Sequence, residues 1–342
     1  QVKSIQDLRE LFAENEFVEN LTSSTQINLP SSSDYFIHNN LDFPIRQKES
    51  ASSIEKFIQY PFDWIMEYQL KMRAYNGLEL GNEHQMKGNI AHKVIENCLN
   101  RFIGVYNGNI EIIENDFEEE FNKVIQQQGV LFLQPEKRFE LSEFKKRFKA
   151  SFYSLIQFIN QNELSVLSCE KSFGNDESIY LDELDTNVGG YIDLVLQKND
   201  GTYVILDLKW TYSSKKFEQK IKDNEAIQLA IYTAAMNQIN NAQTGYYLLN
   251  QNKLITSHDF VGDNIQTIPS NYSSRVILDK VRGSVNFRRR ELLEGKIEIG
   301  DLINLDRLEY VLNENLIQLP EDRKMKSTNK YSGFELFKGQ LN

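Results

Sequence analysis

Residues 188–214 (VGGYIDLVLQKNDGTYVILDLKWTYSS) predict a β-hairpin that carries two acidic residues and a lysine. The tripeptide 199–201 (NDG) is a turn signal between two runs rich in strand-forming residues. Asp193 and Asp207 lie seven residues on either side of its central residue, so strand pairing predicts that their side chains lie opposite each other. Two buried carboxylates repel unless a proton or a cation relieves the charge. The hairpin therefore suggests a divalent cation bound by oxygen ligands.

The lysine that follows the second aspartate strengthens this prediction. Lys209 lies two residues beyond Asp207, so strand alternation returns it to the same face. A metal ion there can lower the pKa of a bound water, and the lysine can place that water or stabilise developing charge. Acid-x-lysine triplets are common and one alone is a weak signal. This one follows a buried-strand pattern at 203–206 (YVIL), which favours a functional site over a solvated surface pair.

Two predicted helices and a strand carry further candidate residues. His92 and Glu96 are four residues apart in a helical pattern, so they share one face. We expect this helix to start at Gly88, because a glycine lets the helix begin close to another backbone. Gln228 and Tyr232 show the same spacing after the hairpin. A hydrogen-bonded histidine, a solvent-facing amide and a core aromatic are the alternatives for these side chains. The remaining candidate is Glu170, which lies inside the strand-like run VLSCEKSF.

The pattern along the chain predicts an α+β fold. Helical periodicity dominates from about 52 to 165, and Ser52 followed by Glu55 suggests a capping box at its start. Strand patterns follow at 165–173, 189–197, 202–210 and 244–250, with a helix at 225–239 between the last two. We expect three parts: an N-terminal helical or irregular extension (1–50), a core (51–260) and a helical C-terminal extension (261–342) that packs on the core.

Composition limits the location and the partners. No apolar run is long enough to span a bilayer and no signal-peptide pattern opens the chain, so we expect a cytoplasmic protein without membrane contact. The first residue is Gln, which suggests a piece of a longer protein. A formal net charge of −11 argues against a uniformly basic surface. Local basic runs at 136–149, 207–222 and 288–290 are either solvated helix faces or a path for a nucleic-acid strand.

The ordered set of motifs resembles the RecB-like branch of the PD-(D/E)XK nuclease superfamily. The resemblance covers about 51–260, and its residues are Gly88, His92, Glu96, Glu170, Gly190, Asp193, Asp207, Lys209, Gln228 and Tyr232. The segment 52–72 looks like the helix before the nuclease core in AddB-type proteins, and 329–339 (NKYSGFELFKG) looks like their tail. The implied fold is restriction-endonuclease-like, with a central mixed β-sheet flanked by helices and helical additions at both ends.

The resemblance also implies a role for each position. His92, Asp193, Asp207 and the backbone carbonyl of Leu208 would bind Mg²⁺ or Mn²⁺, and Lys209 would activate the attacking water. Gln228 and Tyr232 would lie beside the metal and contact the DNA backbone or brace the lysine. Glu96 and Glu170 would orient the ligands.

Some relatives carry an iron–sulfur cluster, and this chain departs from their pattern. Tyr60 stands before Pro61 where the first cluster cysteine would lie, and no cysteine follows Cys169. We therefore predict no iron–sulfur cluster.

The implied activity is metal-dependent hydrolysis of DNA, as an exonuclease module of a repair or recombination protein. The substrate would be single- or double-stranded DNA ends, and a helicase-like partner would supply most of the affinity for them. One alternative is a catalytically silent nuclease fold that serves as a DNA-binding or scaffolding module of a helicase–nuclease complex. Another is a nuclease that acts on RNA or displaced strands.

Overall fold

The computed structural model describes most of the chain between residues 46 and 298 and a few residues beyond. The described residues are 35–37, 46, 48–72, 83–104, 109–174, 179–182, 184–298, 313, 315–318 and 334. Most of the predicted N-terminal extension, and the tail-like segment 329–339 apart from Phe334, lie outside them.

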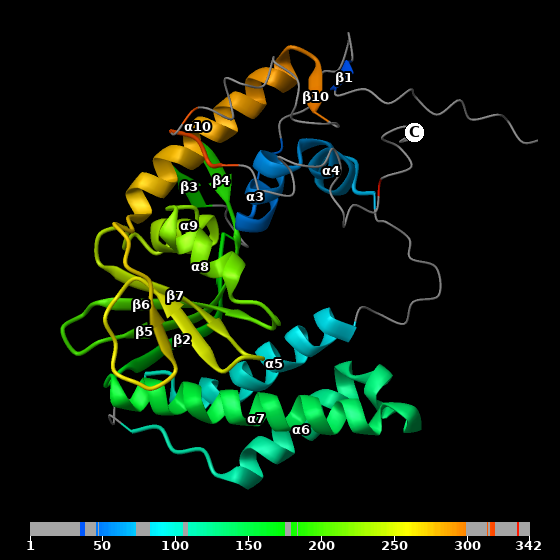
Figure 1. Ribbon diagram of the computed structural model, residues 1–342, viewed down its shortest axis with the longest axis vertical. Coiled ribbons are helices and arrows are strands. Elements are labelled where there is room, and N and C mark those ends of the chain that lie inside the picture. Colours follow the sequence, from blue (N-terminus) through cyan, green and yellow to red (C-terminus); the bar gives the residue numbers. More distant parts are fainter. Residues whose placement is uncertain are drawn as a thin grey trace, which may run out of the picture.

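A six-stranded mixed sheet forms the centre of the molecule (Figure 1). Its order is β2-β5-β6-β7-β8-β9, with parallel pairing at β6–β7 and β8–β9 and antiparallel pairing elsewhere. The strands are β2 (Ser165–Phe173), β5 (Gly190–Gln197), β6 (Tyr203–Lys209), β7 (Ala242–Leu248), β8 (Lys253–Thr256) and β9 (Ile265–Thr267). With helices on both sides, this sheet confirms the predicted restriction-endonuclease-like α+β fold.

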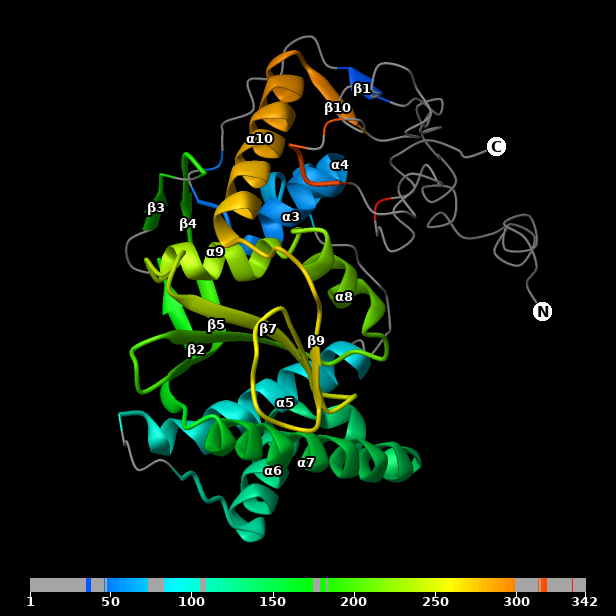
Figure 2. The same ribbon diagram turned by 60° about the vertical axis from the view of Figure 1, so that its left-hand side comes forward.

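Helices cover both faces of the sheet (Figures 1 and 2). One layer, at the bottom of both views, consists of α5 (Glu83–Leu99), α6 (Glu114–Gln128) and α7 (Arg138–Gln161). The other consists of α3 (Ala51–Gln59), α4 (Pro61–Trp64), α8 (Lys215–Lys222), α9 (Ile227–Ala235) and α10 (Ser274–Leu293). Part of the predicted C-terminal extension is therefore α10, which packs against α9 and α3.

Strand β6 shows how the two layers divide its side chains. Val204, Leu206 and Leu208 belong to the core beneath α5, α6 and α7, whereas Ile205 belongs to the core beneath α3 and α9. Both sets are almost fully buried, which is why the strand reads as one apolar run. Alternation then places Asp207 on the α3–α9 side, at the end of a fully covered strand.

Shorter elements complete the described structure. Two small antiparallel sheets pair β1 (Tyr35–Ile37) with β10 (Lys296–Glu298) and β3 (Ile179–Leu181) with β4 (Thr186–Val188). The short helical turns are a π-helix at Ile65–Gln69 and 3₁₀ turns at Asn100–Phe102, Val130–Leu133 and Pro135–Lys137.

Two predicted helix starts were wrong. Helix α3 begins at Ala51, and its capping box joins Ser50 to Ser53 instead of Ser52 to Glu55. Helix α5 begins at Glu83, so Gly88 lies inside the helix and not at its start. A Cβ added at Gly88 would meet the Cβ of Trp210 at 3.7 Å, so the glycine still marks a close crossing of the helix and the end of β6.

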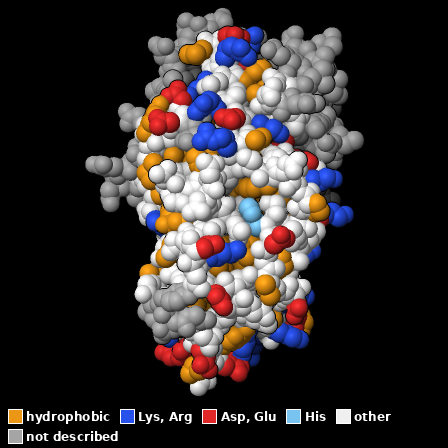
Figure 3. Space-filling view, turned by 90° about the vertical axis from the view of Figure 1, so that its left-hand side faces the viewer, with side chains coloured by type: hydrophobic (Ala, Val, Ile, Leu, Met, Phe, Trp, Pro, Cys, Tyr) orange, Lys and Arg blue, Asp and Glu red, His pale blue; other side chains and the backbone are white. Residues whose placement is uncertain are grey.

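Some of the charged side chains on α6 and α7 pair with each other. The basic run on α7 pairs with the acidic run on α6, through Lys145 with Glu118 and through Lys149 with Glu114 and Glu118. On the face in Figure 3, Lys and Arg gather in the upper part and acidic side chains at the lower end. The ion pairs between α6 and α7 favour a solvated helix pair over a nucleic-acid path along α7.

The third basic run is also partly used in packing. Arg288 is 2 % exposed, and its Nε donates to the carbonyl of Ile58 at 3.0 Å while its Nη1 bonds Glu291 at 2.7 Å. It therefore clamps α10 to α3 and is not available to a nucleic-acid strand.

Among the helices that the structure describes, none is both long and apolar enough to cross a bilayer.

Candidate active site

The hairpin forms at the predicted turn and brings Asp193 to the end of β6. Gly201 has a φ of 87°, a conformation that favours glycine, and its N–H donates to the carbonyl of Lys198 at 3.0 Å. The β5–β6 ladder ends with Leu194 opposite Leu206. One residue beyond it, Asp193 accepts a hydrogen bond at 2.7 Å from the backbone N–H of Leu208 to its Oδ2. The carboxylate of β5 is thereby fixed against the backbone of β6.

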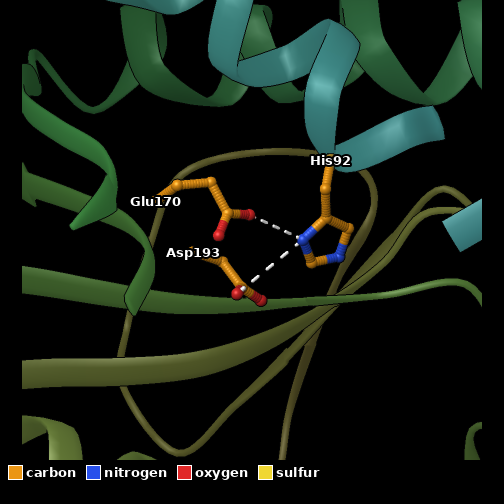
Figure 4. Close-up of side chains that lie close together, drawn as sticks. All are labelled: His92, Glu170 and Asp193. Carbon is orange, nitrogen blue, oxygen red and sulfur yellow. Dashed lines mark hydrogen bonds and ion pairs between the residues drawn. The ribbon is translucent and has the colours of Figure 1, made fainter. Parts of the chain in front are cut away.

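Three side chains from three elements converge beside this hydrogen bond (Figure 4). His92 comes from α5, Glu170 from β2 and Asp193 from β5. The Nδ1 of His92 lies 2.9 Å from Glu170 Oε1 and 3.7 Å from Asp193 Oδ1. One potential ligand atom from each of the three lies within 4.8 Å of the others, so an imidazole nitrogen and two carboxylates can share one metal ion.

Glu170 reaches this cluster through an unusual backbone conformation. Its φ is 47°, in the left-handed region, inside a strand whose paired residues skip from Cys169 to Lys171. Such a conformation costs about 1–3 kcal/mol at a non-glycine residue and tends to occur at functional sites. We expected Glu170 only to orient ligands, but the geometry places it beside His92 as a candidate ligand.

His92 is held between hydrogen-bond acceptors on both ring nitrogens. Glu170 Oε1 faces Nδ1, and the carbonyl oxygen of Leu208 lies 2.9 Å from Nε2. Two acceptors require a doubly protonated ring. Burial lowers the pKa of His92, but the carboxylates of Asp193 and Glu170 outweigh it and raise that pKa to about 9. The imidazolium therefore supplies one positive charge among the acids when no metal is bound.

Asp207 lies beyond this three-residue cluster, in a fully buried position. Lys209 Nζ is 2.7 Å from its Oδ2, yet among the described residues neither carboxylate oxygen has a hydrogen bond of good geometry. Burial raises the pKa of Asp207 to about 6, helped by Asp193 and opposed by Lys209. A buried carboxylate with an incomplete hydrogen-bond set fits a metal ligand, because a cation would replace the missing bonds.

Lys209 remains charged despite its burial. Burial lowers its pKa, but Asp207 and Asp193 outweigh burial and the net shift is upward. It also lines a cleft of about 580 Å³, together with His92, Glu96 and Glu170. The ammonium is thus held beside the carboxylates and open to a bound substrate.

Helix α9 supplies two further predicted residues, and α5 supplies the last one. Tyr232 is 7 % exposed, and burial, followed by the charges of Asp207 and Asp193, raises the pKa of its hydroxyl well above the ordinary value. The hydroxyl therefore stays protonated near the acids. Gln228 lies one turn earlier and is half-buried. Glu96 accepts a hydrogen bond from Lys93 at 2.8 Å on the wall of the cleft.

Sequence reasoning missed one acid near the site. Glu55, expected only as a capping residue, is half-buried and bonds Lys220 Nζ at 2.6 Å, which ties α3 to α8. Its charge also helps to raise the pKa of Lys209. Only the tertiary contact between these helices reveals the pair, since nothing local in the sequence links residues 165 positions apart.

The fold and the site together define a class of protein. A mixed sheet flanked by helices, with acids and a lysine at the end of its central hairpin, is the arrangement of a restriction-endonuclease-like nuclease. A family profile described as the PD-(D/E)XK nuclease superfamily matches residues 48–301, and the chain belongs to that superfamily. A search of curated proteins found no significant match.

Proposed function

We propose that this chain is a Mg²⁺- or Mn²⁺-dependent DNA exonuclease of the RecB-like, AddB-type branch. The observation that carries the proposal is the convergence of His92, Glu170 and Asp193 within 4.8 Å, beside a lysine paired with a fourth acid. These are the groups that metal-assisted phosphodiester hydrolysis needs: oxygen and nitrogen ligands, and a cation that stabilises developing charge.

The donor set fits a hard divalent cation. His92, Glu170 and Asp193 would hold it. The family resemblance adds Asp207 and the Leu208 carbonyl to the ligand set, but that carbonyl faces Nε2 of His92, whereas Glu170 and Asp193 face Nδ1. When bound, the metal would lower the pKa of a water and neutralise a phosphate oxygen. In the metal-free state both ring nitrogens of His92 are protonated and face acceptors. To serve as a ligand, His92 must release the proton from one of these nitrogens.

The remaining residues would prepare the reaction around the scissile phosphate. Lys209 would orient the attacking water or donate a hydrogen bond to a phosphate oxygen, and Asp207 would fix the position of the ammonium. Tyr232 would donate from its neutral hydroxyl, and Gln228 would contact the DNA backbone or brace the lysine. Glu96 would orient groups on the wall of the cleft.

We place the activity in a larger repair or recombination protein located in the cytoplasm. The formal net charge is −11, and two lysines of the basic run on α7, Lys145 and Lys149, are already paired with α6. A helicase-like partner domain or subunit would therefore supply most of the affinity for DNA. A catalytically silent scaffold is the second candidate, but the presence of Asp193, Asp207 and Lys209 together favours an active enzyme.

Cleavage of end-labelled linear single- and double-stranded DNA, with Mg²⁺ or Mn²⁺, tests the proposal. Closed circular DNA would reveal endonuclease activity, and labelled RNA would test the other substrate class. We expect linear DNA to be degraded, with the loss of activity in EDTA and in the Lys209→Ala and Asp193→Asn variants. Metal binding without cleavage by the folded protein would support a silent or partner-dependent module instead.

A further inference from the structure

A second cavity adjoins the candidate active site. Its volume is about 380 Å³, within the range of about 300–1,000 Å³ that is typical of small-molecule sites. Trp210 lines both this cavity and the active-site cleft, and it directly follows Lys209 in the sequence. The cavity therefore shares a wall with the site where we place the scissile phosphate.

The cavity lies at the carboxyl ends of the parallel strands β6 and β7. The N–H of Leu249 donates to the carbonyl of Lys209 at 2.8 Å, which extends the ladder. Trp210 and Asn250, just beyond the two strands, both line the cavity. The crevice outside the carboxyl ends of parallel strands is a common place for ligands. The first half of α7 and the start of α5 supply the other walls.

Two exposed aromatic side chains form its rim. Phe139, near the start of α7, is 74 % exposed, and Tyr212, just beyond β6, is 63 % exposed. Tyr212 also packs against His84 of the active-site cleft, with 5.6 Å between ring centroids. Trp210, by contrast, is 6 % exposed and packs edge-on against Phe144. Of the two aromatics after Lys209, only Tyr212 is available to a ligand.

The charges that line the cavity balance one another, which suits an uncharged base. Glu140 and Glu143 line it together with Lys87 and Arg147. Glu140 lies 3.5 Å from Lys137, and Glu143 lies 4.0 Å from Arg147. Trp210 Nε1 and Asn250 Oδ1 are buried in the wall of the cavity. A base would therefore be held by stacking and not by hydrogen bonds to these two atoms.

We propose that this cavity is a base-stacking subsite for an unpaired nucleotide next to the scissile phosphate, with Tyr212 and Phe139 as its stacking residues. Tyr212 lies three residues after Lys209, so their Cα atoms are at most about 11 Å apart. The subsite therefore takes a base within a few nucleotides of the cut. The inference rests on the proposed function and adds how the strand is held.

The test is the affinity of the full-length chain for labelled oligothymidylate of about 12 nucleotides, within the range of single-strand site sizes. Binding is followed by fluorescence anisotropy in EDTA, so that cleavage plays no part. Tyr212→Ala and Phe139→Ala are compared with Tyr180→Ala, an exposed tyrosine on β3. A blunt duplex of the same length is the second probe.

We expect Tyr212→Ala and Phe139→Ala each to weaken single-strand binding by about 5- to 100-fold, the range for loss of one stacked base. Tyr180→Ala should change it by less than about 2-fold, and duplex binding should change little in all three. Unchanged single-strand affinity in both rim variants would overturn the subsite, and so would an equal loss on single strand and duplex. Tyr212-dependent binding by a protein that never cleaves DNA would retain the subsite and refute the proposed catalysis.

Discussion

Replacing Asp207 by Asn should stabilise the metal-free protein while abolishing cleavage. The folded state raises the pKa of Asp207 from 3.8 to about 6, mainly through burial. When folding raises the pKa of a carboxyl group, the group costs no stability at pH values below its unfolded-state pKa. Stability falls as the pH rises above that pKa toward the folded-state pKa. At pH 8 the ionised carboxylate therefore costs about 3 kcal/mol, from about two pKa units at about 1.4 kcal/mol each.

The neutral amide removes that cost but also deprives Lys209 of the carboxylate at 2.7 Å. Because Asp193 still faces the ammonium, we expect a net gain of about 1–3 kcal/mol at pH 8 in EDTA. Urea unfolding followed by tryptophan fluorescence measures it, with the exposed Asp263→Asn as the matched control. The gain should shrink near pH 4.5, where the buried carboxyl is already protonated. A variant less stable than the wild type at pH 8 without metal would refute this reasoning.

Three further perturbations follow from named contacts. The pKa of His92 is about 9, so below that pH a metal ion must displace a proton from the imidazole. Calorimetric titration should therefore show the Mn²⁺ affinity rising by up to about tenfold per pH unit between pH 7 and 9. An affinity independent of pH would remove His92 from the ligand set. Lys220→Ala leaves the half-buried Glu55 carboxylate without its 2.6 Å partner and should cost about 1–3 kcal/mol in urea unfolding, more than the Glu55→Gln, Lys220→Met double variant. A single variant as stable as the wild type would contradict the pair's importance. Gly88→Ala should stabilise α5 by about 1 kcal/mol in the same assay, since the new Cβ would meet Trp210 only at ordinary contact distance; a clear loss of stability would show that the crossing tolerates no side chain.

The parts of the fold that local patterns encode were predictable. The strand pattern at 165–173 matches β2, and the NDG turn produces the β5–β6 hairpin. In both cases the signal is a run of strand-forming residues bounded by turn residues, which depends little on the rest of the chain. The seven-residue spacing about the turn also brought Asp193 to the end of β6, where Asp207 and Lys209 lie.

The composition of the metal cluster needed the tertiary structure. Glu170 joins His92 through a positive φ in mid-strand, which no strand pattern indicates. Local capping signals were ambiguous in a run of serines, and the structure uses Ser50 with Ser53. Because Glu55 takes no part in the cap, it pairs with Lys220, which lies on a helix far away in the sequence. Convergence of distant elements is a property of the packed fold, so these residues could be assigned only from the structure.

The most direct test of the central claim is the Mn²⁺ affinity of the full chain, measured by electron paramagnetic resonance. Wild-type protein is compared with His92→Ala, Glu170→Gln and Asp193→Asn, and Asp263→Asn serves as the control. We predict one Mn²⁺ site with the same affinity in the wild type and the control. Each cluster variant should bind Mn²⁺ at least about tenfold more weakly. Unchanged Mn²⁺ affinity in all three cluster variants would show that these side chains do not form the metal centre.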